Sequence, residues 1–383
     1  MQGARIGHKA GIAVIRARNK RLNFAVPNGF GEPVLSIQMT EPMSQYPRLA
    51  RMAALIALAL PLAGCFLVDD AADNVRPIPV AQAAELATPV GIWRGGMTVL
   101  VATTRNQEPA NVYFGSKRGE VTTAARAVLY PPSNSLLASI NPVATKTWTI
   151  AGVQKVAGDK PPQVLAGASE GRDVLLYVHG FNETFETSLT SFAGMVSKLQ
   201  FSGAPVLFSW PSAGSVLDYA YDRESAMWSR DALEETLTAL AANPKVGRIH
   251  IIAHSMGGLA LLEALRSISD RTSGLLADRF GAVILANPDV DIDLFKRQMA
   301  RLPYLAAKTT VIISGRDRAL ELSARIAGGV ARVGAADRSA LVASGAQVVD
   351  ATEFGSGLLN HDIFMSNDEV VAVVRRAVEN ATN

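Results

Sequence analysis

The chain has 383 residues, of which 49% are hydrophobic, so it is long enough to build a large domain around a sizeable core. Its sequence pI of about 9.0 is basic, as in many nucleic-acid-binding proteins. However, eight of the 37 Lys and Arg residues, against two of the 34 Asp and Glu residues, lie within residues 1–51, and the rest of the chain is mildly acidic. The charge therefore excludes a nucleic-acid partner for the folded part.

The segment from Met43 to Gly64 has the pattern of a bacterial signal peptide. Arg48 and Arg51 form a positive region, and an apolar run that is too short to span a membrane follows them. The run ends in Leu62-Ala63-Gly64-Cys65, which resembles the lipobox of bacterial lipoproteins, where the cysteine is lipidated and becomes the first residue of the mature chain. We therefore predict a lipid anchor on Cys65, the single cysteine of the chain.

The segments around this leader set the predicted domain organisation and location. Phe66, not aspartate, follows the cysteine, which favours the periplasmic face of the outer membrane over the inner membrane. Residues 1–42 fit neither a leader nor a fold, and we interpret them as an upstream-start artefact or a disordered segment. Residues 65–95 are rich in Ala, Pro and Asp, which is typical of a tether. The folded domain is predicted over 96–383.

The folded part opens with two strand patterns, at 97–105 and 125–130, that suit an antiparallel start of a sheet. Strands then alternate with helices, which predicts βαβ units in an α/β fold. The further strands are expected at 174–178, 205–210, 249–253, 282–286, 309–314 and 347–350, and the helices at about 186–199, 223–242, 256–268, 293–299, 319–326 and 368–378. The fold class is therefore α/β, with a mostly parallel, doubly wound sheet and antiparallel N-terminal strands. Ligands are expected outside the carboxyl ends of the strands.

A short motif joins the apolar strand at 249–253 to the helix that follows it. Ala253-His254-Ser255-Met256-Gly257 matches the nucleophile elbow G-x-S-x-G, with alanine at the first position. Small residues are needed two before and two after the nucleophile because the turn is sharp and strained. Ser255 is thus the candidate nucleophile. The helix that begins at Met256 would point a backbone N–H and a positive dipole end at an oxyanion.

A second strand end carries the candidate oxyanion loop. His179-Gly180-Phe181-Asn182 follows the strand at 174–178, where α/β-hydrolases carry an HG-type loop. The backbone N–H of Phe181, or alternatively of Asn182, is expected to pair with that of Met256. His179 precedes the nucleophile in the chain, which is the wrong order for a general base.

The substrate pocket is predicted to be lined by His179, Asn182, Trp210 and Tyr221 and to be covered by residues 211–228. The candidates for its apolar wall are Trp210, Tyr219, Tyr221 and Trp228. The segment between the strands at 282–286 and 309–314 is too short to hold a cap of several helices. The aromatic side chains are equally consistent with ordinary core residues. The cover segment is therefore the main hypothesis about the pocket.

The general base and its acid follow from chain order. His361 lies between the last strand and the last helix, and of the five histidines it alone suits the order Ser, Asp, His of α/β-hydrolases. Asp317 follows the strand at 309–314, where this fold usually carries its acid. Asp289, which follows the preceding strand, is the alternative, and both carboxylates also suit helix N-caps. The predicted triad is Ser255, His361 and Asp317.

Six short segments add a resemblance that is more specific than the elbow alone. They are VATTR at 101–105, VHGFN at 178–182, SWPS at 209–212, YDRES at 221–225, AHSMGG at 253–258 and DRAL at 317–320. Together they resemble a bacterial family of uncharacterised α/β-hydrolases once catalogued as a domain of unknown function, over about 97–380. The resemblance implies a serine esterase or lipase-like hydrolase of unsettled substrate.

The predicted activity is hydrolysis of a small-molecule or lipid ester through an acyl-enzyme. Neither a cofactor nor a metal is expected, because no group of His, Cys or carboxylate residues has a metal-binding spacing. One alternative is a peptidase or amidase on envelope peptides, since a triad does not separate amides from esters. Another is a lipidated binding protein on an inactive scaffold, against which the three filled triad positions argue. The oligomeric state is left open.

Overall fold

The computed structural model describes residues 12–17, 20–25, 89–107, 113–132, 147–272, 276–354 and 361–382. The chain divides into two compact units, Met1–Val75 and Arg76–Asn383. In the first unit, β1 (Ile12–Ala17) and β2 (Lys20–Ala25) pair as an antiparallel hairpin, within the segment that was predicted to lie outside any fold. The predicted signal peptide and Cys65 lie outside the described residues. None of the described helices is long and apolar enough to cross a membrane.

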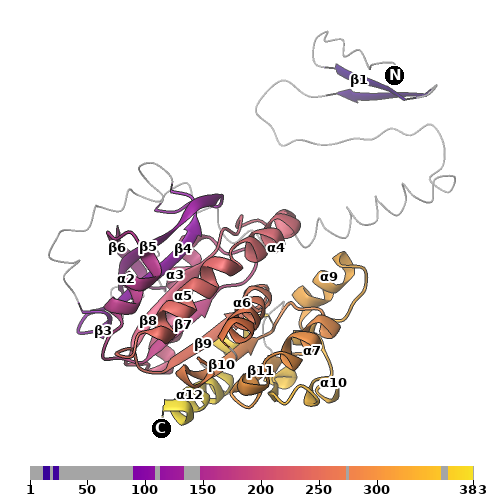
Figure 1. The fold of residues 1–383 in the computed structure, drawn as a ribbon. Coiled ribbons are helices and arrows are strands. Elements are labelled where there is room, and N and C mark those ends of the chain that lie inside the picture. Colours follow the sequence, from indigo (N-terminus) through magenta and orange to yellow (C-terminus); the bar gives the residue numbers. More distant parts are fainter. Residues whose placement is uncertain are drawn as a thin grey trace. The chain divides into compact units, whose positions relative to one another are not determined.

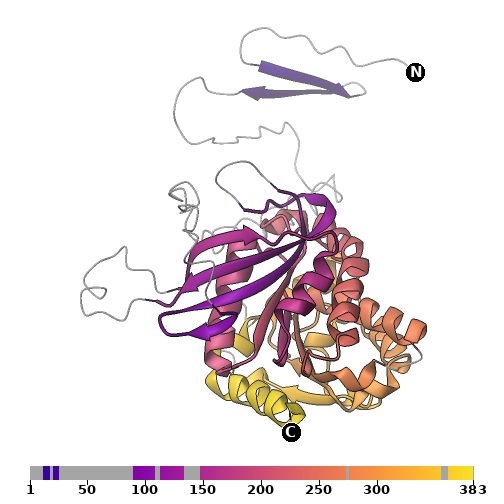
Figure 2. The same ribbon diagram turned by 60° about the vertical axis from the view of Figure 1, so that its left-hand side comes forward.

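The second unit is built on a ten-stranded sheet in the order β12-β11-β10-β9-β7-β8-β4-β5-β6, with β3 paired to β4 (Figures 1 and 2). Its strands are β3 (Gly91–Trp93), β4 (Gly96–Arg105), β5 (Arg118–Tyr130), β6 (Thr149–Lys155), β7 (Val174–Val178), β8 (Ala204–Ser209), β9 (Ile249–His254), β10 (Phe280–Ala286), β11 (Thr309–Ile313) and β12 (Gln347–Asp350). Pairing is parallel from β12 to β4 and antiparallel for β3, β5 and β6. The predicted parallel sheet with antiparallel N-terminal strands is confirmed.

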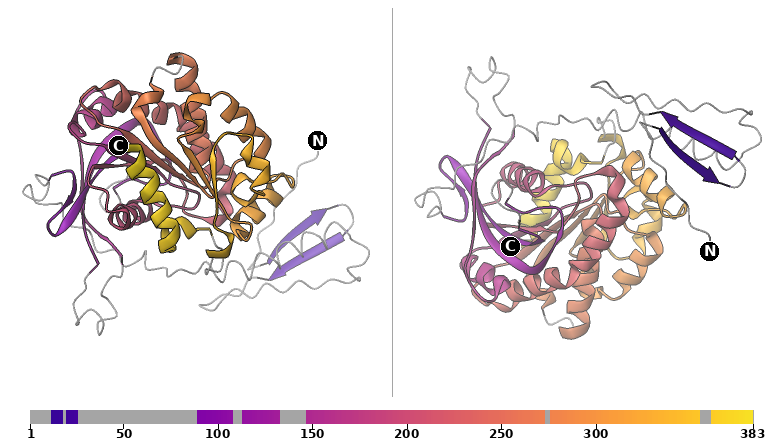
Figure 3. Two further views of the ribbon diagram at one scale, coloured as in Figure 1. Left: turned by 90° about the horizontal axis from the view of Figure 1, so that it is seen from below. Right: turned by 90° about the horizontal axis from the view of Figure 1, so that it is seen from above.

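Helices cover both faces of this sheet (Figure 3). The helices on one face are α3 (Phe185–Leu199), α11 (Ile363–Ser366) and α12 (Asp368–Thr382). The opposite face carries α2 (Pro161–Ala168), α4 (Tyr219–Trp228), α5 (Arg230–Ala242), α6 (Gly257–Thr272), α7 (Ile292–Ala300) and α8 (Pro303–Ala306). The single connection from β11 to β12 contains α9 (Arg318–Ile326) and α10 (Ser339–Val342). The sheet is therefore doubly wound.

The apolar strands read as continuous runs because they are buried on both faces. In β7, Leu175 and Tyr177 pack into the core with α3 and α12, whereas Leu176 and Val178 pack into the core with α5 and α6. Successive side chains of a strand point to opposite faces, so a five-residue apolar run serves both cores at once. Every residue of β7 is buried as a result.

Some observed helices and strands differ from the predicted ones. The differences occur where strand pairing or an interruption of a helix, and not the pattern of apolar residues, sets the bounds of the element. β3 lies inside the segment predicted as tether, and β5 begins at Arg118, because its polar first half is held by pairing with β4 and not by burial. β6 and α2 occupy a stretch read as a loop. The helix expected at 223–242 is two helices divided at Ser229, whose buried hydroxyl donates to the Ser225 carbonyl and also bonds Thr104.

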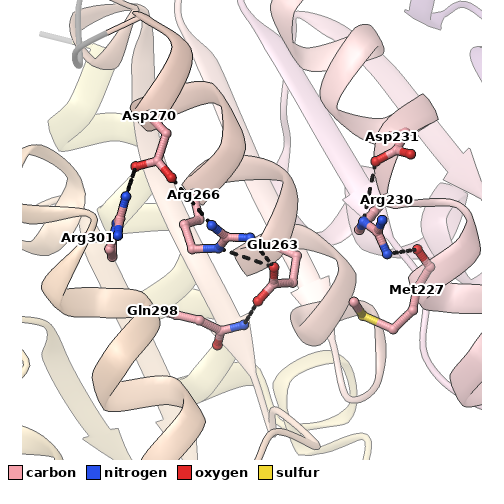
Figure 4. Close-up of polar contacts among 8 residues, drawn as sticks. All are labelled: Met227, Arg230, Asp231, Glu263, Arg266, Asp270, Gln298 and Arg301. Carbon is pink, nitrogen blue, oxygen red and sulfur yellow. Dashed lines mark hydrogen bonds and ion pairs between the residues drawn. The ribbon is translucent and has the colours of Figure 1, made fainter.

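Polar contacts tie α6 to α7 on the outside of one helical layer (Figure 4). Arg266 donates to Glu263 at 2.8 Å and to Asp270 at 3.3 Å, which places all three on one face of α6. Gln298 and Arg301 reach across from the end of α7 to the same two carboxylates, at 2.8 and 2.7 Å. These contacts hold α6, the helix that follows Ser255, against its neighbour.

Candidate active site

The predicted site residues gather at the carboxyl ends of neighbouring parallel strands, as expected for this architecture. Ser255 directly follows β9, and the loop with Gly180 and Phe181 follows β7, which is the neighbour of β9 in the sheet. Asp317 follows β11, and His361 follows β12. The sheet order therefore brings four distant segments to one edge.

Ser255 sits in a strained turn between β9 and α6. Its φ is +50°, a value that non-glycine residues rarely adopt, and backbone hydrogen bonds to its N–H and to its carbonyl hold it there. Its N–H donates to the Ala286 carbonyl at 2.9 Å, and its carbonyl accepts from the Asp289 N–H at 3.0 Å. A side chain at Gly257 would lie 2.7 Å from the Val178 carbonyl oxygen, so the glycine there is required by sterics. The Ser255 hydroxyl makes no hydrogen bond with any other described residue.

The carboxylate of Asp317 binds the imidazole of His361, with 2.7 Å between Oδ2 and Nδ1. The same oxygen accepts from the Asn287 side-chain amide at 2.8 Å, and Oδ1 accepts from the Leu320 N–H at 3.0 Å as the N-cap of α9. Three donors thus fix the orientation of a carboxylate that is only 2% exposed. Because Nδ1 of His361 donates its proton to Asp317, Nε2 is the nitrogen with a free lone pair.

The charge state of His361 depends on two opposing influences. Burial is the largest single influence and lowers the pKa of His361. The carboxylate of Asp317, together with Asp362 and Asp289, raises it by more, so the net pKa lies above its ordinary value. Its ring lies 4.7 Å from the ring of His254, the residue before Ser255, measured between ring centroids. The imidazole is therefore next to the nucleophile turn and has a raised affinity for a proton.

His254 fills the space between the oxyanion loop and His361. It is 4% exposed, and burial together with the nearby His361 lowers its pKa to about 4, so it is neutral near pH 7. A side chain at Gly180 would lie 2.9 Å from its Nδ1, and its ring packs 4.8 Å from Phe364. Its nearest carboxylate oxygen, on Asp362, is 3.7 Å from Nε2. His254 therefore acts as a neutral spacer.

The two proposed oxyanion donors have free backbone N–H groups. Among the described residues, no hydrogen bond uses the N–H of Phe181 or of Met256. The N–H of Asn182, the alternative donor, is occupied, because it donates to Asp222 Oδ2 at 3.2 Å. Asn182 also has a φ of +60°, which marks a tight turn directly after Phe181. Of the two predicted alternatives in this loop, only Phe181 keeps an N–H available to a ligand.

The predicted pocket role of His179 and Trp210 does not fit the structure, because both side chains are fully buried. Their rings stack with centroids 4.7 Å apart, the Trp210 N–H donates to His179 Nε2 at 3.1 Å, and the Trp210 indole donates to the His179 carbonyl at 2.8 Å. Burial, and next the charge of Arg105, keeps the pKa of His179 well below its ordinary value. The pair therefore supports the loop from behind and does not line a pocket.

Two side chains predicted as wall residues, Tyr221 and Tyr219, join the cover segment to the rest of the domain. Tyr221 donates its hydroxyl to the Ser116 carbonyl at 3.0 Å, and the side chain of Asn182 is half-buried. Tyr219, another predicted wall residue, packs its ring edge-on against Phe181 with centroids 5.4 Å apart. The cover at 211–228 therefore packs on the oxyanion loop through Tyr219.

Asp289, the alternative acid, has partners of its own. It accepts from Ser323 at 2.6 Å and from Tyr219 at 2.8 Å, and it lies 3.2 Å from the buried guanidinium of Arg332. These contacts involve both of its carboxylate oxygens. The structure thus joins His361 to Asp317 and leaves Asp289 in a separate buried ion pair.

Several polar residues at the site were not predicted from the sequence. Asn287 binds Asp317, and Arg105, Ser212 and Asp222 lie behind the oxyanion loop. The rule that ligands bind at strand ends would have found Asn287 and Arg105, which follow and end strands. Within the described part of the chain, no three His, Cys, Asp or Glu side chains converge to hold a metal ion, and the absence of a cofactor stays a prediction.

Comparison with protein families gives a match that spans most of the site. A sequence model of the family described as "Alpha/beta hydrolase of unknown function (DUF900)" matches residues 164–377. Among curated proteins, the uncharacterized protein alr1448 of Nostoc sp. (strain PCC 7120 / SAG 25.82 / UTEX 2576) is 30% identical over 122 residues, which are 25% of this chain and 32% of that protein. The chain therefore spans about a third of the length of this curated relative.

Similar solved structures are distant. An uncharacterized protein from Bacillus cereus ATCC 10987 has 13% identity, 56% coverage of this chain, 61% coverage of its own chain and a TM-score of 0.37. A cutinase-like protein from Cryptococcus sp. has 18% identity, coverages of 56% and 96%, and a TM-score of 0.35. Est1E from Butyrivibrio proteoclasticus has 12% identity, coverages of 75% and 98%, and a TM-score of 0.34. The family match, and not these distant structures, carries the assignment.

Proposed function

Because the chain belongs to the alpha/beta hydrolase family of unknown function DUF900, we propose that it is a serine hydrolase that cleaves carboxylic esters. The observation that carries this proposal is the 2.7 Å contact between His361 Nδ1 and Asp317 Oδ2 beside the strained turn at Ser255. A nucleophile, a base and an acid in this relation are the parts that acyl transfer requires.

The proposed reaction has two halves. The Ser255 hydroxyl attacks the ester carbonyl carbon while its proton passes to Nε2 of His361, and the negative charge on the carbonyl oxygen is held by the N–H groups of Phe181 and Met256. The tetrahedral intermediate expels the alcohol, which takes the proton from His361. Water then attacks the acyl-enzyme by the same route, which releases the carboxylic acid and restores the serine. Asp317 holds the imidazole in the required tautomer throughout.

Intact mass after treatment with a fluorophosphonate probe tests the proposal on the full chain. We expect one adduct on the parent, none on Ser255→Ala, and labelling of His361→Ala that is slower by at least about 100-fold. Ser314→Ala is the matched control, since Ser314 is another buried serine just after a strand of the same sheet, and it should label like the parent. A folded parent without an adduct would contradict the proposal.

The proposed acyl donor is an ester and not an amide. Comparing the rates of hydrolysis of an ester and of the corresponding amide tests this choice. The two substrates are p-nitrophenyl acetate and p-nitroacetanilide, which have the same acyl group and differ in the atom that leaves. Initial rates of hydrolysis are measured for both. Turnover of the first substrate alone supports an esterase. Comparable turnover of the anilide would favour the peptidase or amidase alternative.

We also propose that the chain is anchored by lipid on Cys65 at the periplasmic face of the bacterial envelope, on the outer membrane in preference to the inner. The support is the sequence pattern of Arg48, Arg51 and the run ending at Cys65. Cell fractionation and intact mass of the purified chain test it. We expect a membrane-bound chain that begins at Cys65 and carries added acyl mass, and a Cys65→Ala chain without that mass. An unmodified Cys65 in the mature parent would rule this anchor out.

A further inference from the structure

Three buried polar residues meet behind the oxyanion loop, and the triad mechanism gives none of them a role. Arg105 ends β4, Ser212 follows β8, and Asp222 lies in α4 of the cover segment. Their exposed fractions are 2%, 0% and 0%. Burying a cation and a carboxylate is unfavourable unless hydrogen bonds compensate, so their contacts should show what the cluster supports.

Asp222 and Ser212 together bind two consecutive amides of the loop. Asp222 Oδ2 accepts from the Asn182 N–H at 3.2 Å and from the Ser212 hydroxyl, and Oδ1 accepts from the Ala213 N–H at 2.7 Å. The Ser212 oxygen in turn accepts from the Glu183 N–H at 3.0 Å. The loop is therefore held from its cover side at the two residues that directly follow Phe181.

Arg105 binds the same loop through one carbonyl group, that of Glu183. Its guanidinium donates to the Glu183 carbonyl at 2.7 Å, to the Ser212 carbonyl at 3.0 Å and to the Ser209 hydroxyl at 2.9 Å. Burial lowers the pKa of Arg105 to about 10, which leaves it charged at neutral pH. Burial raises the pKa of Asp222, and the positive charge of Arg105 opposes this rise; the two side chains are joined through Ser212 and not directly.

The cluster binds two of the three successive amides at this point of the loop. The N–H groups of Asn182 and Glu183 are taken up, whereas the Phe181 N–H, one peptide unit earlier, has no partner among the described residues. Asn182, at φ +60°, makes the turn between the free amide and the bound ones. We propose that Asp222 is a positioning residue of the oxyanion hole, which orients the Phe181 N–H by binding the next amide of the loop. This inference rests on the proposed serine hydrolase function.

The proposal makes a kinetic distinction that a merely structural role would not make. An oxyanion donor interacts more strongly with the tetrahedral transition state than with the bound ester, so its misplacement lowers kcat and leaves KM nearly unchanged. Loss of folding would instead lower the number of sites that a probe can titrate. Rates expressed per titrated site therefore separate the two.

The experiment measures kcat and KM for p-nitrophenyl acetate per fluorophosphonate-titrated site on the full chain. We expect Asp222→Ala to lower kcat by about 10²–10³-fold, as for loss of one oxyanion donor, with KM within about twofold of the parent. Asp222→Asn keeps one acceptor oxygen and should lose about tenfold. Asp218→Ala is the matched control because it removes an exposed carboxylate from the start of the same helix, and it should stay within about twofold.

Each other outcome overturns the inference. An Asp222→Ala chain with the kcat of the parent per site, or with a loss confined to KM or to the titratable fraction, contradicts the positioning role. If Asp222→Ala does not fold, Asp222→Asn decides, and parental kcat in that variant contradicts the role. A folded parent that neither labels nor turns over substrate contradicts the proposed function itself and this inference with it, so the two failures are distinguished.

Discussion

Two aspartates at neighbouring strand ends show how the same sequence signal leads to different surroundings. Asp317 follows β11 and Asp289 follows β10, both are 2% exposed, and each was a candidate for the acid of the triad. Asp317 binds His361 Nδ1, whereas Asp289 binds Tyr219 and lies against the Arg332 guanidinium. A carboxylate at the right strand end is therefore not sufficient to identify the acid.

The faces of the sheet explain the difference. Tyr219, the partner of Asp289, packs against the core beneath α5 and α6. Phe364, close to His361 in the chain, packs in the opposite core with α3 and α12. Asp289 therefore joins a network on one side of the sheet edge, while His361 approaches from the other side and meets Asp317. The two carboxylates should respond to mutation in different measurements.

The largest expected effect is on catalysis by Asp317→Asn. Loss of the carboxylate leaves His361 in the wrong tautomer, so kcat should fall by about 10⁴-fold per titrated site. Asp289→Asn keeps the His361 contact and should change kcat by less than about tenfold. Hydrolysis of p-nitrophenyl acetate measures both variants. If Asp289→Asn shows the larger loss, the assignment of the acid is reversed.

The next effect is on stability, through Asp289→Ala. Removing this carboxylate leaves the guanidinium of Arg332 buried and unpaired, which should lower the free energy of unfolding by about 3–5 kcal/mol. Urea unfolding measures the change. The double variant Asp289→Leu with Arg332→Met is the control, and it should recover much of the loss because no buried charge remains. If the double variant does not recover stability, the Asp289–Arg332 pair stabilises the fold by more than the neutralisation of its two charges.

The pKa of His361 offers a third way to compare the effects of Asp317 and Asp289. Because the pKa of His361 is raised above its ordinary value, the imidazole becomes protonated, and activity is lost, as pH falls through that raised pKa. Asp317→Asn should move the titration to lower pH, and Asp289→Asn should move it in the same direction by less. NMR titration of the His361 ring measures both shifts directly. Equal shifts would show that the 2.7 Å contact has no special weight.

The smallest expected effect belongs to Tyr219→Phe. The change removes the hydroxyl that donates to Asp289 at 2.8 Å but keeps the ring contact with Phe181. The free energy of unfolding should fall by about 1.5 kcal/mol, as for loss of a hydrogen bond to a charged group. Urea unfolding and kcat are measured together. A large loss of kcat without loss of stability would move Tyr219 into the catalytic machinery.

Local patterns of the sequence were sufficient for the main elements and for part of the site. The largely apolar runs at 174–178 and 249–253 predicted β7 and β9, because a strand buried on both faces is mostly apolar. The small residues around Ser255 predicted a sharp turn there. These inferences succeeded because each depends on neighbours within a few positions of the chain.

Contacts between distant segments could not be predicted in this way. The sequence left Asp317 and Asp289 as alternatives and suggested a pocket role for Trp210, which is fully buried against His179. Asp222 and its amide partner Asn182 are 40 positions apart in the chain and meet only when α4 packs on the loop after β7. Sequence periodicity reports which face of an element is buried, whereas the partner of a buried polar group is decided by strand order and helix packing.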